Sequence, residues 1–444
     1  MSRAYGSLVL GELGHSSAVW AGAFAVSACA AIAGSIPATL VSTALDAGEI
    51  QRLGLLSLAS TTLTLSIVAS IVVLSGVLQK IVIVRATEIS QWALLGATPR
   101  QIATVTHLQI LTVALLGATT GAAVGAPIAP GLATLGLRGT TGLDGLAVHG
   151  SLVGQFIVVA GVGAVALCCA VGAGRRAATL PPLTGVRRSV PGPHRGRSAT
   201  WIGASGLGVV AALMLAGLPA AATGSASQLL LIGPVLVGAA AALPANAFGA
   251  VARAWSSGIR DRTGVVLELG RASAVTMTTR GDSAVGGLVL AIGLPTGLLA
   301  GVDALHRSAG GDAGTDSSAG VAMLIGGPTV LALASAGAGV AMSARLRARE
   351  GAQLSAAGAE ARMVVSVAVL AQLFHVVTAT VIVGATLAVG GILESALLGR
   401  WVLSLGWPVL AVMVPVCAFV VGGAATAISL TSSRAGIPEL LRAE

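Results

Sequence analysis

Charge, lysine and aromatic side chains are all scarce in this chain. Only 9% of its 444 residues are Asp, Glu, Lys or Arg, and 3% are aromatic, whereas a soluble domain carries about 25% charged residues. The single lysine, Lys80, is followed by isoleucine. A P-loop needs a lysine followed by Ser or Thr to hold the phosphates of a nucleotide. We therefore expect no ATPase of that type within this chain.

Cysteine and histidine are also few. The six histidines are scattered, and no HExxH zinc motif occurs. Buried thiols in apolar helices behave as small hydrophobic residues, so the cysteine spacing indicates neither a disulfide framework nor a metal cluster. The sequence predicts no catalytic site, no metal and no cofactor bound by the chain, and it disfavours an intramembrane enzyme. The four cysteines all lie in apolar runs: Cys29, Cys168, Cys169 and Cys417.

Apolar and small residues are abundant instead. Hydrophobic residues make up 55% of the chain, the mean hydropathy is +0.93, and there are 61 glycines. This composition predicts an all-α polytopic membrane protein whose helices approach closely through small residues. The net charge of +9 would suit nucleic acid in a soluble protein. Here the cations lie in short segments between apolar runs, so we expect contact with membrane lipid and no nucleic acid.

Apolar runs of about 20 residues mark the predicted membrane spans. The first run is too long for the apolar core of a signal peptide, so we interpret it as a span. The sequence predicts ten transmembrane helices near 18–45, 54–83, 104–136, 152–174, 200–222, 227–251, 281–302, 319–343, 364–392 and 402–429.

The basic residues predict an orientation for these spans. With both termini in the cytoplasm, only Arg52, Arg138, Arg307 and Arg400 of the 25 Lys and Arg residues fall in outer loops, which leaves 21 inside. Positive charge concentrates in the cytoplasmic loops of membrane proteins. We therefore expect a multi-pass protein of the cytoplasmic membrane with cytoplasmic termini.

A charged segment between the second and third spans recurs later in the chain. Residues 85–100 read RATEISQWALLGATPR, and residues 347–362 read RAREGAQLSAAGAEAR. Both contain Arg-x-x-Glu, then Gly-Ala, then Arg at the same spacing. The Arg and Glu share one face of a helix, and the glycine is typical of a helix end. A recurrence at a fixed offset indicates a duplicated unit.

The duplication extends to other positions. Glu12-Leu13-Gly14 before the first span resembles Glu268-Leu269-Gly270 before the seventh, and Pro37 in the first span is matched by Pro295 in the seventh. We predict two parallel four-span repeats joined by an inserted span pair. The predicted domains are a first repeat at 1–174, a basic cytoplasmic linker with the inserted pair at 175–251, and a second repeat at 252–444.

The spacing Arg-x-x-Glu-(x)7-Gly-Ala-(x)2-Arg resembles the signature of FtsX-like permeases, the membrane subunits of ABC transporters of the MacB and BceB type. The resemblance covers nearly the whole chain as two copies. It implies that the two segments are coupling helices seated on a separate ABC ATPase homodimer, with ATP and Mg bound by that partner. It assigns ATPase coupling to Arg85, Glu88, Gly96, Ala97, Arg100, Arg347, Glu350, Gly358, Ala359 and Arg362.

One feature departs from many members of that family, which insert a large extracytoplasmic domain between the first two spans of a repeat. The corresponding loops here are only about 46–53 and 303–320. We therefore expect no large extracytoplasmic domain, and recognition of a hydrophobic or amphipathic substrate, such as a peptide antibiotic, drug or lipid, within the spans. Pro37 and Pro295 are candidate gate hinges, because proline kinks a helix, with simple packing as the alternative.

Other interpretations remain open at the level of sequence. The chain could be a signalling protein through which an ATPase controls a cell-wall hydrolase or sensor kinase, although the short outer loops give such a partner little to bind. It could be an ion-coupled transporter, although few intramembrane carboxylates are visible. Two further features favour helix packing over a role in transport. One is the ridge of small residues Gly117, Gly121 and Gly125, and the other is the set of polar residues at membrane depth, His107, Gln109, Gln372 and His375.

Overall fold

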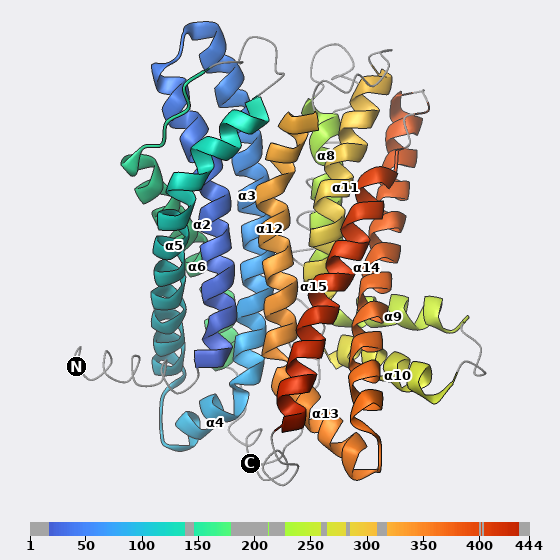
Figure 1. The fold of residues 1–444 in the computed structure, drawn as a ribbon. Helices are drawn as coiled ribbons and strands as arrows, with labels where there is room; N and C mark the ends of the chain where they lie inside the picture. Colours follow the sequence, from blue (N-terminus) through green and yellow to red (C-terminus); the bar gives the residue numbers. More distant parts are fainter. Residues whose placement is uncertain are drawn as a thin grey trace. The chain divides into compact units, whose positions relative to one another are not determined.

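The structure is a computed structural model of the whole chain. It describes residues 17–137, 146–178, 227–258, 264–280, 285–308, 318–398 and 404–434, together with residues 212 and 401. All secondary structure in these ranges is helical (Figure 1). The helices are α2 (Ser17–Asp46), α3 (Glu49–Val84), α4 (Ala86–Leu94), α5 (Pro99–Leu137), α6 (Leu152–Ala178), α8 (Ser227–Ala241), α9 (Ala245–Ser256), α10 (Val265–Arg280), α11 (Val285–Ser308), α12 (Ser318–Met342), α13 (Ala344–Ala356), α14 (Ala361–Leu398) and α15 (Trp407–Arg434).

Seven helices of the described residues are long and apolar enough to cross a membrane: α2, α3, α5, α6, α11, α14 and α15. They coincide with seven of the ten predicted spans, which confirms a polytopic helical membrane protein. The helix α12 coincides with an eighth, but its apolar part, Gly326–Met342, is shorter than the other seven. Pro127 and Pro130 lie inside α5, which continues to Leu137.

The predicted span 227–251 is not a single straight helix. The chain bends by 96° between Leu230–Ala241 and Ala245–Ser256, and extended backbone at Pro244 precedes α9. Proline disfavours helical conformation in the residue before it and lacks the N–H that would continue the helix. The predicted span 227–251 is therefore formed by two helices with a sharp bend between them. The predicted span 200–222 lies outside the described residues except at residue 212, so the count of ten stays a prediction.

The chain divides into two compact units. Unit 1 comprises Met1–Gly192 and Ala309–Ala338, and unit 2 comprises Pro193–Ser308 and Gly339–Glu444. Most of α12 thus belongs to unit 1, although its sequence lies in the predicted second repeat. The two units are defined by contacts, whereas the two repeats were predicted from sequence similarity, so the units do not test the repeats. The predicted boundaries at 174 and 251 and the duplication itself remain predictions.

Unit 1 is built around α2, which packs against α3, α5 and α6. The closest approach is to α5, where glycines remove the side chains that would separate the two helices. A methyl group at Gly117 would lie 2.6 Å from the Phe24 carbonyl oxygen, and one at Gly121 would overlap the backbone of Ala28. The ridge predicted from sequence therefore serves helix packing.

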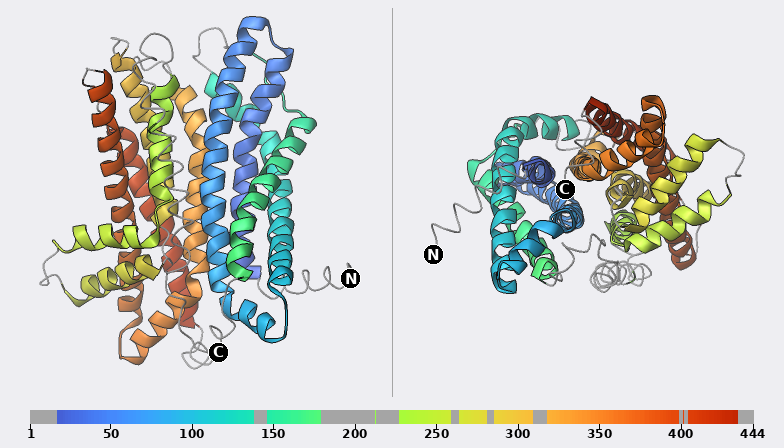
Figure 2. Two further views of the ribbon diagram at one scale, coloured as in Figure 1. Left: turned by 180° about the vertical axis from the view of Figure 1, so that it is seen from behind. Right: turned by 90° about the horizontal axis from the view of Figure 1, so that it is seen from below.

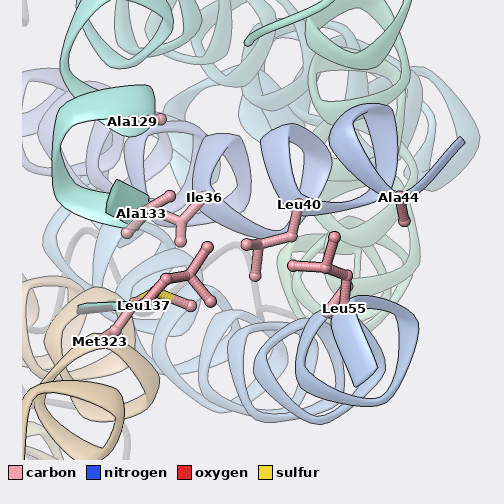
Figure 3. Close-up of a cluster of buried hydrophobic side chains, with 9 residues drawn as sticks. Ile36, Leu40, Ala44, Leu55, Ala129, Ala133, Leu137 and Met323 are labelled. Carbon is pink, nitrogen blue, oxygen red and sulfur yellow. The ribbon is translucent and has the colours of Figure 1, made fainter. Parts of the chain in front are cut away.

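An apolar cluster fills one part of unit 1, and Figure 3 shows its side chains meeting between the helices. Leu40 of α2 and Leu55 of α3 are completely buried. Leu137, at the end of α5, packs with Met323 of α12 in the same cluster. These contacts explain why the first part of α12 belongs to this unit.

In unit 2, α11 packs against α8, α14 and α15. The two shorter helices α9 and α10 run across the long helix α14 (Figure 1, Figure 2). The indole of Trp255 on α9 stacks on Phe374 with ring centroids 5.2 Å apart, and its Nε1–H donates to the Thr378 hydroxyl at 3.0 Å. His375 lies within hydrogen-bond distance of the Ala274 carbonyl on α10, at 3.2 Å. The polar side chain His375 on α14 thus joins helices, as predicted.

The segment 146–151 is held against the end of α2 by polar contacts. The Ser42 hydroxyl donates to the carbonyl of His149 at 2.7 Å, and the imidazole Nε2 of His149 lies 2.8 Å from the Asp46 carboxylate. The hydrogen bond to Asp46 is the main cause that raises the pKa of His149 above its ordinary 6.5. This contact is consequently strongest when the imidazole is protonated.

The raised pKa predicts a pH dependence for this attachment. Protonation of His149 is favoured in the folded chain, so the contact with Asp46 stabilises the fold fully below pH 6.5. This stabilisation is lost as the pH rises through the higher pKa that His149 has in the folded chain. We expect an NMR titration of His149 to give a pKa above 6.5 and the variant Asp46→Asn to bring it back toward that value. An unchanged His149 titration in Asp46→Asn would contradict the assignment.

Candidate functional site

The two recurring charged segments form two short helices, each followed by a tight turn and a long helix. In unit 1, α4 follows α3 after a break at Arg85 and contacts α3 and α5. In unit 2, α13 follows a break at Ser343 and contacts α14 and α15. The backbone angles at the breaks agree, with φ −92° and ψ 9° at Arg85 and φ −85° and ψ 4° at Ser343. Both segments therefore turn the chain in the same local way.

The turns that end α4 and α13 have the same hydrogen bonds. The Gly96 N–H donates to the Ala93 carbonyl and the Ala97 N–H to the Trp92 carbonyl, at 3.1 and 3.0 Å. The corresponding bonds of the second turn, from Gly358 to Ser355 and from Ala359 to Leu354, measure 3.0 and 2.9 Å. This pair of bonds is a Schellman motif, which stops a helix.

Glycine is required at the centre of each turn. Gly96 has φ +91° and Gly358 has φ +93°, a conformation that other L-residues rarely adopt. The next helix then begins three residues later in each case, at Pro99 and at Ala361. The predicted helix end at these glycines is confirmed, and the match between the two segments extends from sequence to local backbone geometry.

The two short helices differ in length. From the break to the glycine there are 11 residues in the first segment (96 − 85) and 15 in the second (358 − 343). Four extra residues amount to about one helical turn. Arg347, which matches Arg85 in sequence, consequently lies inside α13, and Ser343 occupies the structural position of Arg85. Sequence register alone does not show this added turn.

Arg85 is buried, with an exposed fraction of only 4%. Its Nε donates to the Glu88 carboxylate at 2.7 Å and its NH1 to the Gln109 side-chain oxygen at 2.8 Å. The guanidinium also lies over the rings of Trp20 and Trp92, 5.5 and 5.6 Å from their centroids. These contacts join α4 to α2 and α5. The structure therefore places the Arg85 side chain where it holds α4 in position, and not on an exposed surface.

Glu350 attaches the second segment by different contacts. Its carboxylate accepts a hydrogen bond from the Ser273 hydroxyl of α10 at 3.2 Å. A cleft beside it is lined by Met277 of α10, Leu354 of α13 and Val364 of α14. The side chain of Arg347 lies outside the described residues. Thus α4 is joined to the long helices around it through an arginine, whereas α13 is joined to a neighbouring short helix through a glutamate.

The turns expose the remaining predicted residues. Arg100 and Arg362 are both exposed, and so are Gly96 and Gly358, while Ala97 and Ala359 are partly exposed. The first turn also carries Leu94 and Leu95, with exposed fractions of 55% and 87%. An arginine beside uncovered leucines suits a protein interface better than a fully solvated loop does. These leucines were not predicted from the sequence, although an apolar pair directly before the turn glycine is a visible signal.

The proposed hinge prolines lie within continuous helices. Pro37 is inside α2 and Pro295 is inside α11. Beside Pro295, the Thr296 hydroxyl donates to the Ile292 carbonyl, a local bond often found where helices bend. Among the described residues, no group of three or more His, Cys, Asp or Glu side chains could hold a metal ion.

Comparisons with protein-family models, with curated proteins and with solved structures found no match for this chain. The function of the chain is therefore inferred from the paired turns and their surroundings, together with the repeated Arg-x-x-Glu and Gly-Ala motif.

Proposed function

We propose that this chain is the permease subunit of an ABC transporter, in which α4 and α13 are coupling helices that bind a separate ATPase homodimer. The supporting observation is the pair of matching helix–turn–helix segments, each with a Schellman turn centred on a positive-φ glycine. A partner with two identical subunits presents two identical grooves, and a chain that binds both needs two elements of similar local shape.

The exposed and buried arginines have separate roles in this proposal. Arg100 and Arg362, on the exposed turns, contact the ATPase, since arginine is favoured at protein interfaces. Arg85 is a positioning residue that transmits movement of α4 to α2 and α5 through Trp20 and Gln109. In unit 2, movement of α13 passes to α10 through the Glu350 and Ser273 contact and to α14 by packing.

The transported substrate in this proposal is hydrophobic or amphipathic and moves outward. The supporting observation is the shortness of the predicted outer loops, because α2 ends at Asp46 and α3 begins at Glu49. So short a connection has no space for a separate binding domain. Binding energy must then come from the helices themselves and from the lipid around them.

Charge reversal on both turns tests the proposal. We expect the double variant Arg100→Glu with Arg362→Glu to bind its ABC ATPase partner at least about tenfold more weakly than the natural chain does, because losing an interface arginine costs roughly 1.4 kcal/mol or more. The measurement is copurification in detergent, followed by titration of ATPase activity with the permease.

The matched control is the variant Arg175→Glu with Arg253→Glu, which reverses two exposed arginines outside the turns. We expect this control to bind the ATPase like the natural chain. Equal binding by the natural chain and the turn variant, or equal loss in the control, would argue against coupling through α4 and α13.

A further inference from the structure

A carboxyl group lies buried in unit 2, near the end of α14 that is farther from the Gly358 turn. Glu394 is four residues before the end of α14, and only 7% of its surface is exposed. It lines a cleft between α8, α11 and α14, together with Leu387 on its own helix and Ser404 beyond it. Glu394 was not predicted from the sequence, because a lone carboxylate near a span end resembles a loop residue.

Glycines shape this cleft. Gly233 of α8 and Gly297 of α11 cross so closely that a methyl group on Gly233 would lie 2.5 Å from the carbonyl oxygen of Gly297. Gly390 and Gly391, one turn before Glu394, also line the cleft. Because glycine has no side chain, these positions leave the space beside Glu394 open.

Glu394 has no hydrogen-bond or ion-pair partner among the described residues. The nearby Ser404 hydroxyl does not serve, because it donates to the Asp303 carboxylate at 2.7 Å. An ionised carboxylate at membrane depth is costly unless it is paired, and such residues mark substrate or ion pathways. The cleft therefore offers a carboxylate to a group that carries a positive charge and can donate hydrogen bonds.

A protonated amine fits this arrangement better than a metal ion does. An ammonium group carries three donors and one positive charge, and that charge matches the single carboxylate of Glu394. No described group of three or more His, Cys, Asp or Glu side chains could hold a metal ion. The cleft has a free volume of about 10 Å³, which is room for one water-sized group such as an ammonium, so the hydrocarbon part of an amphipathic molecule would stay in the surrounding lipid.

We propose that this cleft binds the ammonium group of an amphipathic substrate, with Glu394 as its counter-ion. This site rests on the proposed function, because it specifies a lipophilic amine as the substrate of the proposed permease. The binding itself is a property of this chain and can be measured without the ATPase.

Octylammonium is a suitable probe, and 1-octanol is its uncharged counterpart. We expect the purified full chain in nanodiscs to bind octylammonium in calorimetric titrations and to bind 1-octanol at least about tenfold more weakly. The variant Glu394→Gln is expected to lose this preference, whereas Glu360→Gln, an exposed glutamate at the other end of α14, keeps it. Equal octylammonium affinity in Glu394→Gln and the natural chain would overturn the proposal.

A second measurement needs no variant at Glu394. Dicyclohexylcarbodiimide modifies carboxyl groups in apolar surroundings, and mass spectrometry locates the adduct. Octylammonium is expected to protect Glu394 from this reagent severalfold, with no protection by 1-octanol. Equal labelling with and without octylammonium would overturn the site even if Glu394→Gln failed to fold.

The two proposals fail in distinguishable ways. Octylammonium binding with no ATPase complex would refute the coupling role and leave the amine site intact. An ATPase complex sensitive to Arg100 and Arg362, with no octylammonium binding, would support the permease and refute the amine site.

Discussion

Arg85→Ala is expected to lower the unfolding free energy of the protein by about 3 kcal/mol, because charge-assisted hydrogen bonds contribute roughly 1.5–3 kcal/mol and the ring contacts add to them. The substitution removes the guanidinium, whose Nε donates to Glu88 and whose NH1 donates to the buried Gln109. It also leaves an empty space between the rings of Trp20 and Trp92. We expect a lower thermal midpoint in detergent and release of α4 from α2 and α5.

The comparison that isolates this effect is Arg100→Ala, which removes an exposed arginine from the same segment. Its expected stability change is within about 0.5 kcal/mol, as for most surface substitutions. Arg85→Lys should fall between the two, because an ammonium group keeps the charge but lacks the planar fork. Equal stabilities for Arg85→Ala and Arg100→Ala would show that the burial of Arg85 does not hold α4.

Gly121→Leu is expected to destabilise unit 1 by about 3 kcal/mol or more, since overpacking at a tight contact forces backbone shifts. A side chain at this position must displace the backbone of Ala28 on α2, and backbone cannot turn aside as a flexible side chain can. We expect little folded protein in detergent, measured by size-exclusion fluorescence and by the rate of thermal aggregation.

Gly131→Leu provides the matched control, because it makes the same change on the same helix where an added methyl group meets nothing within 4 Å. That position is exposed, and leucine is a better helix former than glycine by up to about 1 kcal/mol. We expect equal or higher stability. Similar losses in both variants would show that glycine flexibility, and not the close approach of α2, is what α5 requires.

Sequence patterns predicted those elements whose signals are local. Continuous apolar runs located the seven long helices, and Gly96 and Gly358 located the ends of α4 and α13. The spacing of three residues predicted that Arg85 and Glu88 share a helix face, and the structure adds an ion pair between them. Each of these features depends on residues within a short stretch of the chain, so it can be recognised from the sequence alone.

Features that depend on distant residues could not be predicted. Arg85 was expected to face a partner because the pattern shows only its charge, whereas its burial results from Trp20 and Gln109 on other helices. Likewise, the apolar composition of 227–251 suggested one span, but Pro244 allows a bend that packing against α10 and α14 stabilises. The proposed role of Glu394 depends on a cleft that is lined by glycines from other helices, and only the fold brings those glycines close to it.

The additional turn of α13 has a consequence for a two-subunit motor. Four residues lengthen the helix by about 6 Å, so in the proposed complex two identical ATPase subunits would bind coupling helices of unequal length. A symmetric dimer bound in this manner would become asymmetric on assembly, and its two ATP molecules need not be hydrolysed in step. Single-turnover kinetics should then reveal two rates from one kind of subunit.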